Sequence, residues 1–339
     1  MNSLLKYNRA RLHVLDRIAA LQLQPGDLLP TQQELLADGG FSLICLKRAL
    51  AELESEGVVS KGQGRRACLL KKLERNDFSG FVVFLCLYRY TPAIPSDVYI
   101  MRDEFARRGI ELRIEAVKRP DVDLSGICRD ALGIMVMGWI TREWLDYLRI
   151  YKLPLLAVGS NPFPEELAGV GLDWYAAATE VCRMLRECQC RRIALVNGAK
   201  RYLPAREIER AVKDDARRAG LRSPSGLQVW CDFQDGLFTY RSIRKLFSRA
   251  NEFDGVVLEE GTWPAALLMA REMNLPSRIR FGTILSITSV EGACLTNITV
   301  VSFPQTLPKM AVNFFLNRLK NGRTDEVEQF LLKPFPAKY

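Results

Sequence analysis

Hydrophobic and polar positions change their spacing along this chain. Apolar residues recur at helical spacing through residues 3–21, and the turn-forming sequence Gln-Pro-Gly-Asp at 24–27 interrupts that pattern. From residue 81 onwards, short continuous apolar runs alternate with helical segments. The pattern therefore predicts a small helical region followed by a larger α/β region.

Two helices with clear ends are predicted after the first turn. Thr31 and Glu34 have the spacing of a capping box, so a short helix should begin there and run to about residue 38. Ser42 is expected to cap a second helix that runs to about residue 56 and stops at Gly57. The first turn of this second helix, Leu43-Ile44-Cys45-Leu46, is unusually apolar.

Residues 58–70 have the pattern of two short strands joined by a Gly-rich turn with basic residues. A helix, a helix-turn-helix and a hairpin in this order form a winged helix-turn-helix, which places the second helix of the pair in the major groove of DNA. We therefore expect a winged helix-turn-helix DNA-binding domain at residues 1–70. The charged segment 71–78 is expected to be a linker.

Charge supports a polyanionic partner for the first region. The chain carries a formal net charge of +9. Residues 1–72 hold eleven Lys and Arg against seven Asp and Glu, and the other 267 residues hold 37 against 32. Positive charge is therefore several times denser in the N-terminal fifth, which favours nucleic acid as its partner, although a small domain can also be slightly basic without binding DNA.

Turn, cap and core residues occur in a specific order along the first 64 residues. They are Pro25-Gly26-Asp27, Leu29-Pro30-Thr31, Glu34-Leu35, Ser42, Lys47, Ala49-Leu50, Leu53-Glu54, Glu56-Gly57-Val58-Val59 and Gly62-Gln63-Gly64. This set resembles the DNA-binding domain of the GntR family. The resemblance implies a double-stranded DNA operator as partner, and the candidate DNA-binding residues are Thr31, Gln33, Ser42, Leu43, Lys47, Arg48, Lys61, Gln63, Arg65 and Arg66.

The second helix departs from that family. Its usual start is Ser-Arg-Thr-Thr-Val-Arg, and here the sequence is Ser-Leu-Ile-Cys-Leu-Lys at 42–47, while Gln33 replaces a customary arginine. Apolar side chains can contact thymine methyl groups, but they cannot make the bidentate bonds that read guanine. Two hypotheses follow: specificity depends on Lys47, Arg48, Gln33 and the wing, or operator recognition is lost and the apolar turn packs against protein. We favour retained DNA binding, because five Lys and Arg residues between 61 and 72 can contact phosphates.

Two series of alternating strands and helices are predicted beyond residue 78. The first has strands at 81–88, 111–117, 132–138 and 155–158, with helices at 98–108 and 142–151. The second begins after residue 173, with helices at 174–187, 206–219, 239–250 and 264–273 and strands at 192–196, 227–230, 254–258 and 279–284. Short apolar strands separated by helices indicate parallel sheets covered on both faces, so we expect two α/β lobes in series.

An ordered series of short motifs supports this reading of the body. They are Leu153 to Val158, Val170-Gly171-Leu172-Asp173, Leu185, Arg191 to Gly198, Phe253 to Val257, and Leu295 to Val300 before a helix at 307–319. Together they resemble the effector-binding domain of the LacI/GalR family, which is similar to periplasmic sugar-binding proteins. A GntR-type head on such a body is the architecture of bacterial regulators of arabinose use.

The resemblance implies the organisation of the body. Residues 79–339 form an effector-binding and dimerisation domain, with lobe 1 at about 79–172 and 303–323 and lobe 2 at about 173–302 and 324–339. In this organisation residues 295–303 cross back to the first lobe, and the segment near 327–333 returns to the second. A ligand between the lobes favours one closure angle, which changes the spacing of two heads in a dimer.

Ligands of open α/β sheets bind beyond the carboxyl ends of the strands. This rule gives the candidate effector-binding residues Tyr88, Arg89, Tyr90, Trp139, Arg206, Trp230, Phe233, Glu259, Glu260 and Phe303, with Ser160 and Asn161 nearby. Aromatic rings at these positions can stack on a sugar, and Arg or Glu can bind its hydroxyl groups or charge. The sugar-anchoring residues of the family are poorly kept, since Glu259-Glu260 replaces Asn-Asp and Ile284 replaces an Asp. A modified sugar, a charged ligand or no ligand are therefore all open.

Other classes of protein fit less well. No apolar run approaches the roughly 20 residues that span a bilayer, and the first 18 residues lack the apolar block of a secretory signal, so we expect a cytoplasmic protein. The nine cysteines suit reduced thiols, without a CxxC motif for zinc, and His13 is the single histidine. We therefore expect no enzyme, metal or cofactor, and consider a free-standing solute-binding protein or a regulator without an inducer as alternatives.

Overall fold

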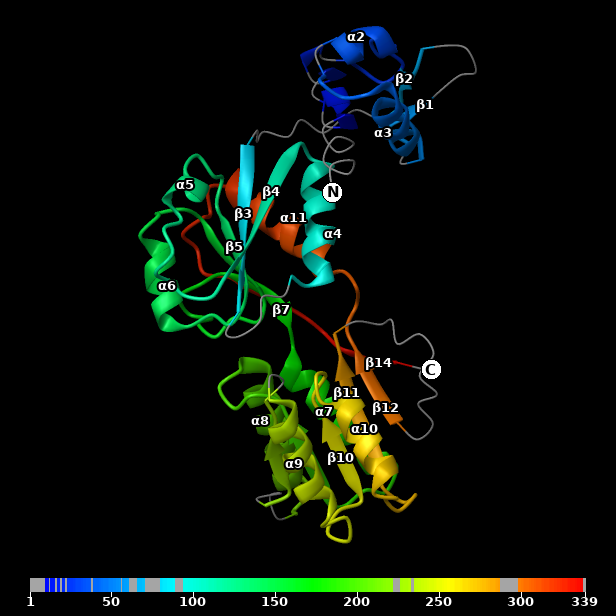
Figure 1. Cartoon of the computed structure of the whole chain (residues 1–339), viewed down its shortest axis with the longest axis vertical. Helices are drawn as coiled ribbons and strands as arrows, with labels where there is room; N and C mark the ends of the chain where they lie inside the picture. Colours follow the sequence, from blue (N-terminus) through cyan, green and yellow to red (C-terminus); the bar gives the residue numbers. More distant parts are fainter. Residues whose placement is uncertain are drawn as a thin grey trace. The chain divides into compact units, whose positions relative to one another are not determined.

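The structure is a computed structural model of the chain (Figure 1). It describes all residues except 1–9, 12, 16, 19, 22, 38, 56, 61–65, 71–79, 89–93, 222–225, 233–234, 287–297 and 338–339. The chain divides into two compact units, one of residues 1–83, 95–114 and 126–133 and one of residues 84–94, 115–125 and 134–339.

The N-terminal head of the first unit has the elements of a winged helix-turn-helix. Helical residues between 10 and 20 precede helices α2 (Gln32–Ala37) and α3 (Leu43–Ser55) and the strands β1 (Val59–Ser60) and β2 (Cys68–Leu69). β1 and β2 pair antiparallel, and a further bridge joins Leu28 to Cys68. The predicted order of helices and strands in the head is thus confirmed.

Local side-chain bonds define the ends of the two head helices. The Thr31 backbone N–H donates to Glu34 Oε2 at 2.6 Å, and the Glu34 N–H donates to Thr31 Oγ1 at 3.2 Å, which confirms the capping box. The Cys45 N–H donates to Ser42 Oγ at 3.4 Å, and α3 is followed by Gly57 at φ +65°.

Apolar residues from all parts of the head form one core. It contains Val14, Leu15, Ile18, Leu29, Leu35, Leu46, Leu50, Leu53, Val59 and Leu69. Leu46, Leu50 and Leu53 lie at the helical spacing of α3, so one face of this helix is buried and the opposite face is left for solvent or a partner.

The first large sheet has the strand order β13-β7-β6-β5-β3-β4. Its strands are β3 (Gly80–Leu87), β4 (Ile110–Val117), β5 (Ile134–Gly138), β6 (Leu155–Gly159), β7 (Gly169–Leu172) and β13 (Gln329–Leu332). The connecting helices are α4 (Ser96–Ala106), α5 (Ser125–Cys128) and α6 (Arg142–Arg149), and α11 (Leu307–Lys320) packs on β6 and β7. β6 pairs in parallel with β5 and with β7, as the continuous apolar runs predict.

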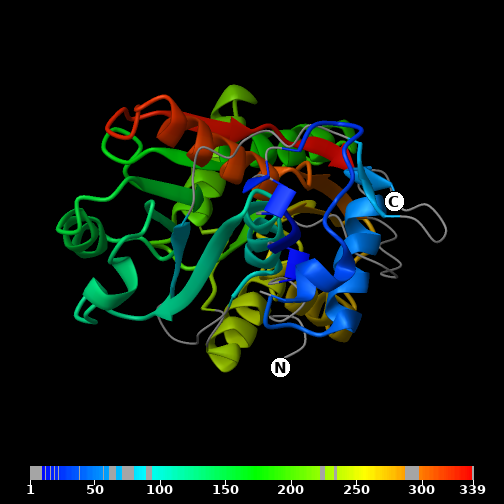
Figure 2. The ribbon, with the colours of Figure 1, turned by 90° about the horizontal axis from the view of Figure 1, so that it is seen from above.

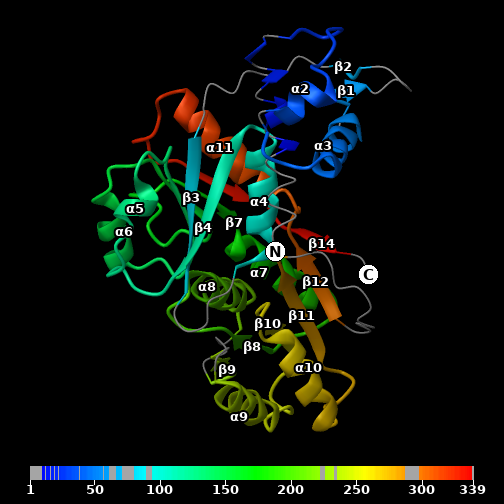
Figure 3. The ribbon, with the colours of Figure 1, turned by 45° about the horizontal axis from the view of Figure 1, so that its top comes forward.

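The second large sheet has the strand order β14-β12-β11-β10-β8-β9. Its strands are β8 (Ile193–Asn197), β9 (Gln228–Trp230), β10 (Gly255–Leu258), β11 (Arg280–Leu285), β12 (Ile298–Ser302) and β14 (Phe335–Ala337). The helices are α7 (Trp174–Glu187), α8 (Leu203–Arg218), α9 (Gly236–Phe247) and α10 (Trp263–Glu272). α9 and α10 share a buried cluster with β8 and β10, and Figure 3 shows them beside these strands.

The end of the chain differs from the prediction that residues 324–339 return to the second lobe. β13 pairs in parallel with β7 and extends the first sheet, and only β14 joins the second, antiparallel to β12. Both strands lie in the red segment of Figure 2. The Gln329 side chain donates to the Leu167 carbonyl at 2.5 Å, which anchors β13 to the loop before β7. The assignment of residues 327–333 to the second lobe is therefore wrong.

Candidate functional site

The exposed face of α3 is the candidate DNA interface of the head. The side chains of Lys47 and Arg48 are exposed, and Leu43 and Ile44 are exposed by 41% and 79%. Leu46 alone of the four residues in the apolar first turn is fully buried in the head core. The face therefore presents two apolar side chains next to two cations.

The other predicted DNA-binding residues have different surroundings. Gln33 and Ser42 are exposed, whereas Thr31 Oγ1 is engaged in the capping box. Arg66 is exposed, and its Nε donates to the Leu29 carbonyl at 3.0 Å, so it also fixes the strand before α2. Lys61, Gln63 and Arg65 lie outside the described residues.

A cavity of about 340 Å³ in the second unit is the candidate effector site. It is lined by Gly138, Trp139, Ile140, Thr141, Ser160, Pro162, Arg201, Tyr202 and Leu203. One group of these residues lies at or just after the ends of β5 and β6 of the first sheet, and the other lies in the connection from β8 to the first residue of α8 of the second. The cavity thus lies beyond the carboxyl ends of parallel strands, where ligands of open α/β sheets bind.

Two stacked aromatic rings form part of the cavity wall. The rings of Trp139 and Tyr202 have centroids 6.0 Å apart and planes that differ by 8°. The Trp139 backbone N–H donates to the Leu87 carbonyl at 2.9 Å, and Gly138 has φ +105°. A Cβ at Gly138 would lie 2.2 Å from the Leu87 oxygen, so only glycine allows β5 to place Trp139 here.

A buried carboxyl group lies close to Tyr202. Glu259 follows β10, is 4% exposed, and accepts a bond of 2.9 Å from the Gly261 N–H. Burial raises the pKa of Glu259 to about 7, despite that bond. Burial, with the nearby charge of Glu259, also raises the pKa of Tyr202 to about 12, although a hydrogen bond with Ser160 opposes this shift.

Glu260 is held in place by Ser286. The Ser286 backbone N–H donates to Glu260 Oε1 at 2.8 Å, and its hydroxyl lies 2.6 Å and 2.8 Å from the two carboxylate oxygens. Glu260 thus connects the end of β10 to the end of β11. Neither glutamate is among the residues that line the cavity.

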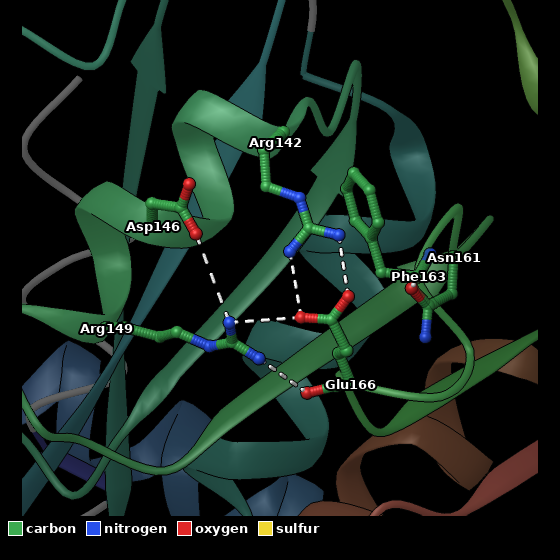
Figure 4. Close-up of polar contacts among 6 residues, drawn as sticks. All are labelled: Arg142, Asp146, Arg149, Asn161, Phe163 and Glu166. Carbon is green, nitrogen blue, oxygen red and sulfur yellow. Dashed lines mark hydrogen bonds and ion pairs between the residues drawn. The ribbon is translucent and has the colours of Figure 1, made fainter.

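Charged residues fix the loop that carries Ser160 and Pro162. Arg142, the first residue of α6, donates to both carboxylate oxygens of Glu166 at 2.8 Å and 2.6 Å, and Arg149 donates to the same group at 3.2 Å (Figure 4). The Arg142 guanidinium carbon lies 4.4 Å from the Phe163 ring centroid. The bonds with Arg142 are the main reason that the pKa of Glu166 falls to about 2. The cluster therefore ties two segments of the cavity wall together.

Of the predicted effector-binding residues, the cavity includes Trp139. Phe303 is fully buried, its ring packs edge-to-face on Trp174 at 5.5 Å, and it is not among the residues that line the cavity, so its contact with a ligand stays a prediction. Arg206, Trp230 and Tyr88 are not among the lining residues: Arg206 is exposed in the first turn of α8, Trp230 ends β9, and Tyr88 follows β3. Arg89, Tyr90 and Phe233 lie outside the described residues.

Sequence reasoning missed the contribution of Tyr202 and Arg201. Both lie several residues beyond the end of β8, whereas most of the predicted residues directly follow a strand and only Arg206 lies further on. The only signal was the position of an aromatic residue in the connection that follows β8. Among the residues that the structure describes, no helix is long and apolar enough to cross a membrane, and no group of His, Cys, Asp and Glu could hold a metal ion.

Comparisons with known proteins agree with both parts of the chain. Residues 6–68 match the family described as bacterial regulatory proteins, gntR family. No curated protein matches the sequence. The solved structures with a similar fold include a LacI family transcriptional regulator from Mycobacterium smegmatis, with 16% identity, a TM-score of 0.62, and coverage of 76% of this chain and 97% of that one.

Two further solved structures have the same fold. The transcription regulator CcpA of Lactococcus lactis has 17% identity and a TM-score of 0.60, covering 77% of this chain and 98% of that one. A structure described as the transcriptional regulator CelR–cellobiose complex has 15% identity and a TM-score of 0.64, covering 88% of this chain and 91% of that one. The chain therefore has a head that matches the gntR family and a body with the fold of LacI-family regulators.

Proposed function

We propose that this protein binds a duplex DNA operator through α3 and adjacent parts of the head, and that a small ligand in the Trp139–Tyr202 cavity changes its affinity for that operator. The observation that carries the DNA-binding part is the exposed face of α3, whose opposite face is buried in the head core. Lys47 and Arg48 would contact phosphate or base edges, and Leu43 and Ile44 would contact thymine methyl groups.

The cavity supports the ligand part of the proposal. Trp139 follows a strand of one sheet and Tyr202 precedes a helix of the other, so a ligand that contacts both rings binds best at one separation of the two sheets. Carbohydrates suit this wall because their C–H faces pack on aromatic rings while hydroxyl groups bond Ser160. The cellobiose complex of a protein with this fold supports the same class of ligand.

Regulation would follow from coupling the two sites. A ligand that changes operator affinity by a coupling free energy of about 1–3 kcal/mol alters it roughly 5- to 150-fold. A homodimer would present two heads to two half-sites, so a change in their spacing would alter DNA binding. The alternative is a regulator without an inducer, in which no ligand of the cavity would change the affinity for DNA.

The test uses the full chain and duplexes selected from a random pool. The affinity of the selected duplex is measured with each member of a carbohydrate panel, and at least one member should change it about fivefold or more. Trp139→Ala should remove that change and keep the duplex affinity without ligand, whereas Trp139→Phe should keep part of it. Failure to select any duplex would refute the DNA-binding part, and an unaltered response in Trp139→Ala would refute the cavity.

A further inference from the structure

Positive side chains are concentrated in the connection between β8 and α8 and in the first turn of α8. Lys200, Arg201 and Arg206 are all exposed, and residues 198–206 contain no Asp or Glu. Arg201 lines the cavity beside Tyr202, and Lys200 Nζ lies 6.0 Å from the ring centroid of Trp230. One edge of the candidate ligand site is therefore basic.

Two acidic groups near Tyr202, Glu259 and Glu260, are engaged by other partners. Glu260 is bonded by both the backbone and the hydroxyl of Ser286. Glu259 is buried, bonded to the Gly261 N–H, and absent from the residues that line the cavity. Its raised pKa of about 7 also leaves a substantial fraction of this group uncharged at neutral pH. Both carboxyl groups are thus bonded elsewhere, and neither lines the cavity with Arg201.

We propose that the cavity takes an anionic carbohydrate, in which a carboxylate or phosphate group binds Arg201 and the sugar ring packs against Trp139 and Tyr202. This inference rests on the proposed function, since it names the ligand class of the same cavity. A guanidinium binds both kinds of oxyanion through two parallel N–H bonds, which gives a geometric preference as well as charge. A cationic ligand would be repelled by Arg201.

The residues around the ring would position the anion. Ser160, which follows β6, is only 9% exposed and lines the same cavity as Arg201, which lies in the connection after β8. The stacked rings of Trp139 and Tyr202 offer an apolar surface of fixed orientation. A ligand with an apolar ring face and one charged substituent matches this combination, because each part of the wall then has a partner.

The experiment measures the melting temperature of the full chain with matched ligands at constant ionic strength. Glucose, glucuronate and glucose 6-phosphate form one series, and galactose, galacturonate and galactose 6-phosphate form another. At least one charged sugar should raise the melting temperature and bind about tenfold or more tightly than its neutral parent. The carboxylate and phosphate members then separate the two sources of the anion.

Variants identify the residue that binds the charge. Arg201→Gln should weaken binding of the charged sugar about tenfold and leave the melting temperature without ligand unchanged, because Arg201 is exposed. Arg241→Gln, which removes an exposed cation from α9, should bind as the wild type does. Equal binding by Arg201→Gln and the wild type would overturn the inference.

Inorganic phosphate tests the anion position without a sugar ring. Phosphate should raise the melting temperature of the wild type more than that of Arg201→Gln, and an equal shift in the two proteins would contradict the inference. If only neutral sugars bind, and Trp139→Ala abolishes that binding, the anionic ligand is wrong while the proposed function stands. If neither phosphate nor any sugar of either series binds, the inference is overturned. The proposed function is then tested separately by the measurement of duplex affinity with the wider carbohydrate panel.

Discussion

The exposed face of α3 and the wall of the Trp139–Tyr202 cavity are two candidate binding surfaces that differ in how much their residues contribute to the stability of the fold. On α3, Leu43, Ile44 and Lys47 are exposed and make little contribution to the head core. At the cavity, Gly138 has no room for a side chain, and Glu259 near Tyr202 is almost fully buried.

The two surfaces therefore tolerate different substitutions without loss of the fold. An exposed helix face can exchange side chains with little effect on stability, so a departure from the usual family sequence there alters what is recognised rather than whether the head folds. The cavity region depends on close backbone contacts and buried polar groups, so substitutions at its buried positions should change the free energy of unfolding. The comparison is testable by substitution on each side.

The largest expected effect is at Gly138. Gly138→Ala should lower the free energy of unfolding by at least about 3 kcal/mol, because it combines a left-handed φ with a Cβ placed 2.2 Å from the Leu87 oxygen. Urea denaturation measures the change. Gly220→Ala is the control, since Gly220 has φ +66° and open space around its Cβ, and it should lose only about 1 kcal/mol. Equal losses would contradict the close approach at Gly138.

Glu259 should make stability depend on pH. Its pKa is about 7 in the folded chain and 4.5 ordinarily, so between pH 4.5 and 7 the folded protein keeps a proton that the unfolded chain has released. The free energy of unfolding of the wild type should therefore fall by up to about 3 kcal/mol as pH rises through this window. Glu259→Gln should lack this dependence, so its free energy of unfolding relative to that of the wild type should increase with pH. Parallel plots of the free energy of unfolding against pH for the two proteins would argue against a buried carboxyl with a raised pKa.

Loss of the capping box before α2 should have an effect of intermediate size. Thr31→Ala removes the oxygen that accepts the Glu34 N–H and should lower the free energy of unfolding by about 1 kcal/mol. Thr31→Ser keeps that oxygen and should lose less. The change is measured by denaturation of the full chain, and no difference between the Ala and Ser variants would show that the cap does not stabilise the head.

The smallest effect on stability is expected at Ile44. Ile44→Ser should change the free energy of unfolding by no more than about 0.5 kcal/mol, because this side chain is 79% exposed. It should nevertheless reduce the preference for thymine in duplexes selected from a random pool, because the methyl contacts are lost. A large loss of stability would place Ile44 in a packed surface instead.

The fold was largely predictable because its signals are local. The capping box at Thr31 and Glu34, the cap at Ser42 and the stop at Gly57 each act within a few residues, and the structure has the predicted helices between them. β13 was assigned to the wrong sheet because the sequence of a short edge strand does not indicate which strand it pairs with. Its partner β7 lies some 160 positions earlier in the chain.

The candidate cavity was only partly predictable for the same reason. Trp139 was found because it directly follows a strand, but Phe303 also does and is instead buried against Trp174. Tyr202 lies five residues beyond β8, and the path of that connection determines that it stacks on Trp139. The residues at a strand end can be identified from sequence, whereas the directions of their side chains depend on packing between distant segments.

DNA recognition by α3 can be tested through the salt dependence of the full chain's affinity for a selected duplex. The wild type should lose affinity steeply as salt rises, and Lys47→Gln with Arg48→Gln should bind more weakly with a shallower slope, because two phosphate-contacting cations are removed. Arg241→Gln with Lys245→Gln, two exposed cations of α9, should keep the wild-type slope. Binding that does not depend on salt, or a slope that the α3 substitutions leave unchanged, would contradict DNA recognition by this helix.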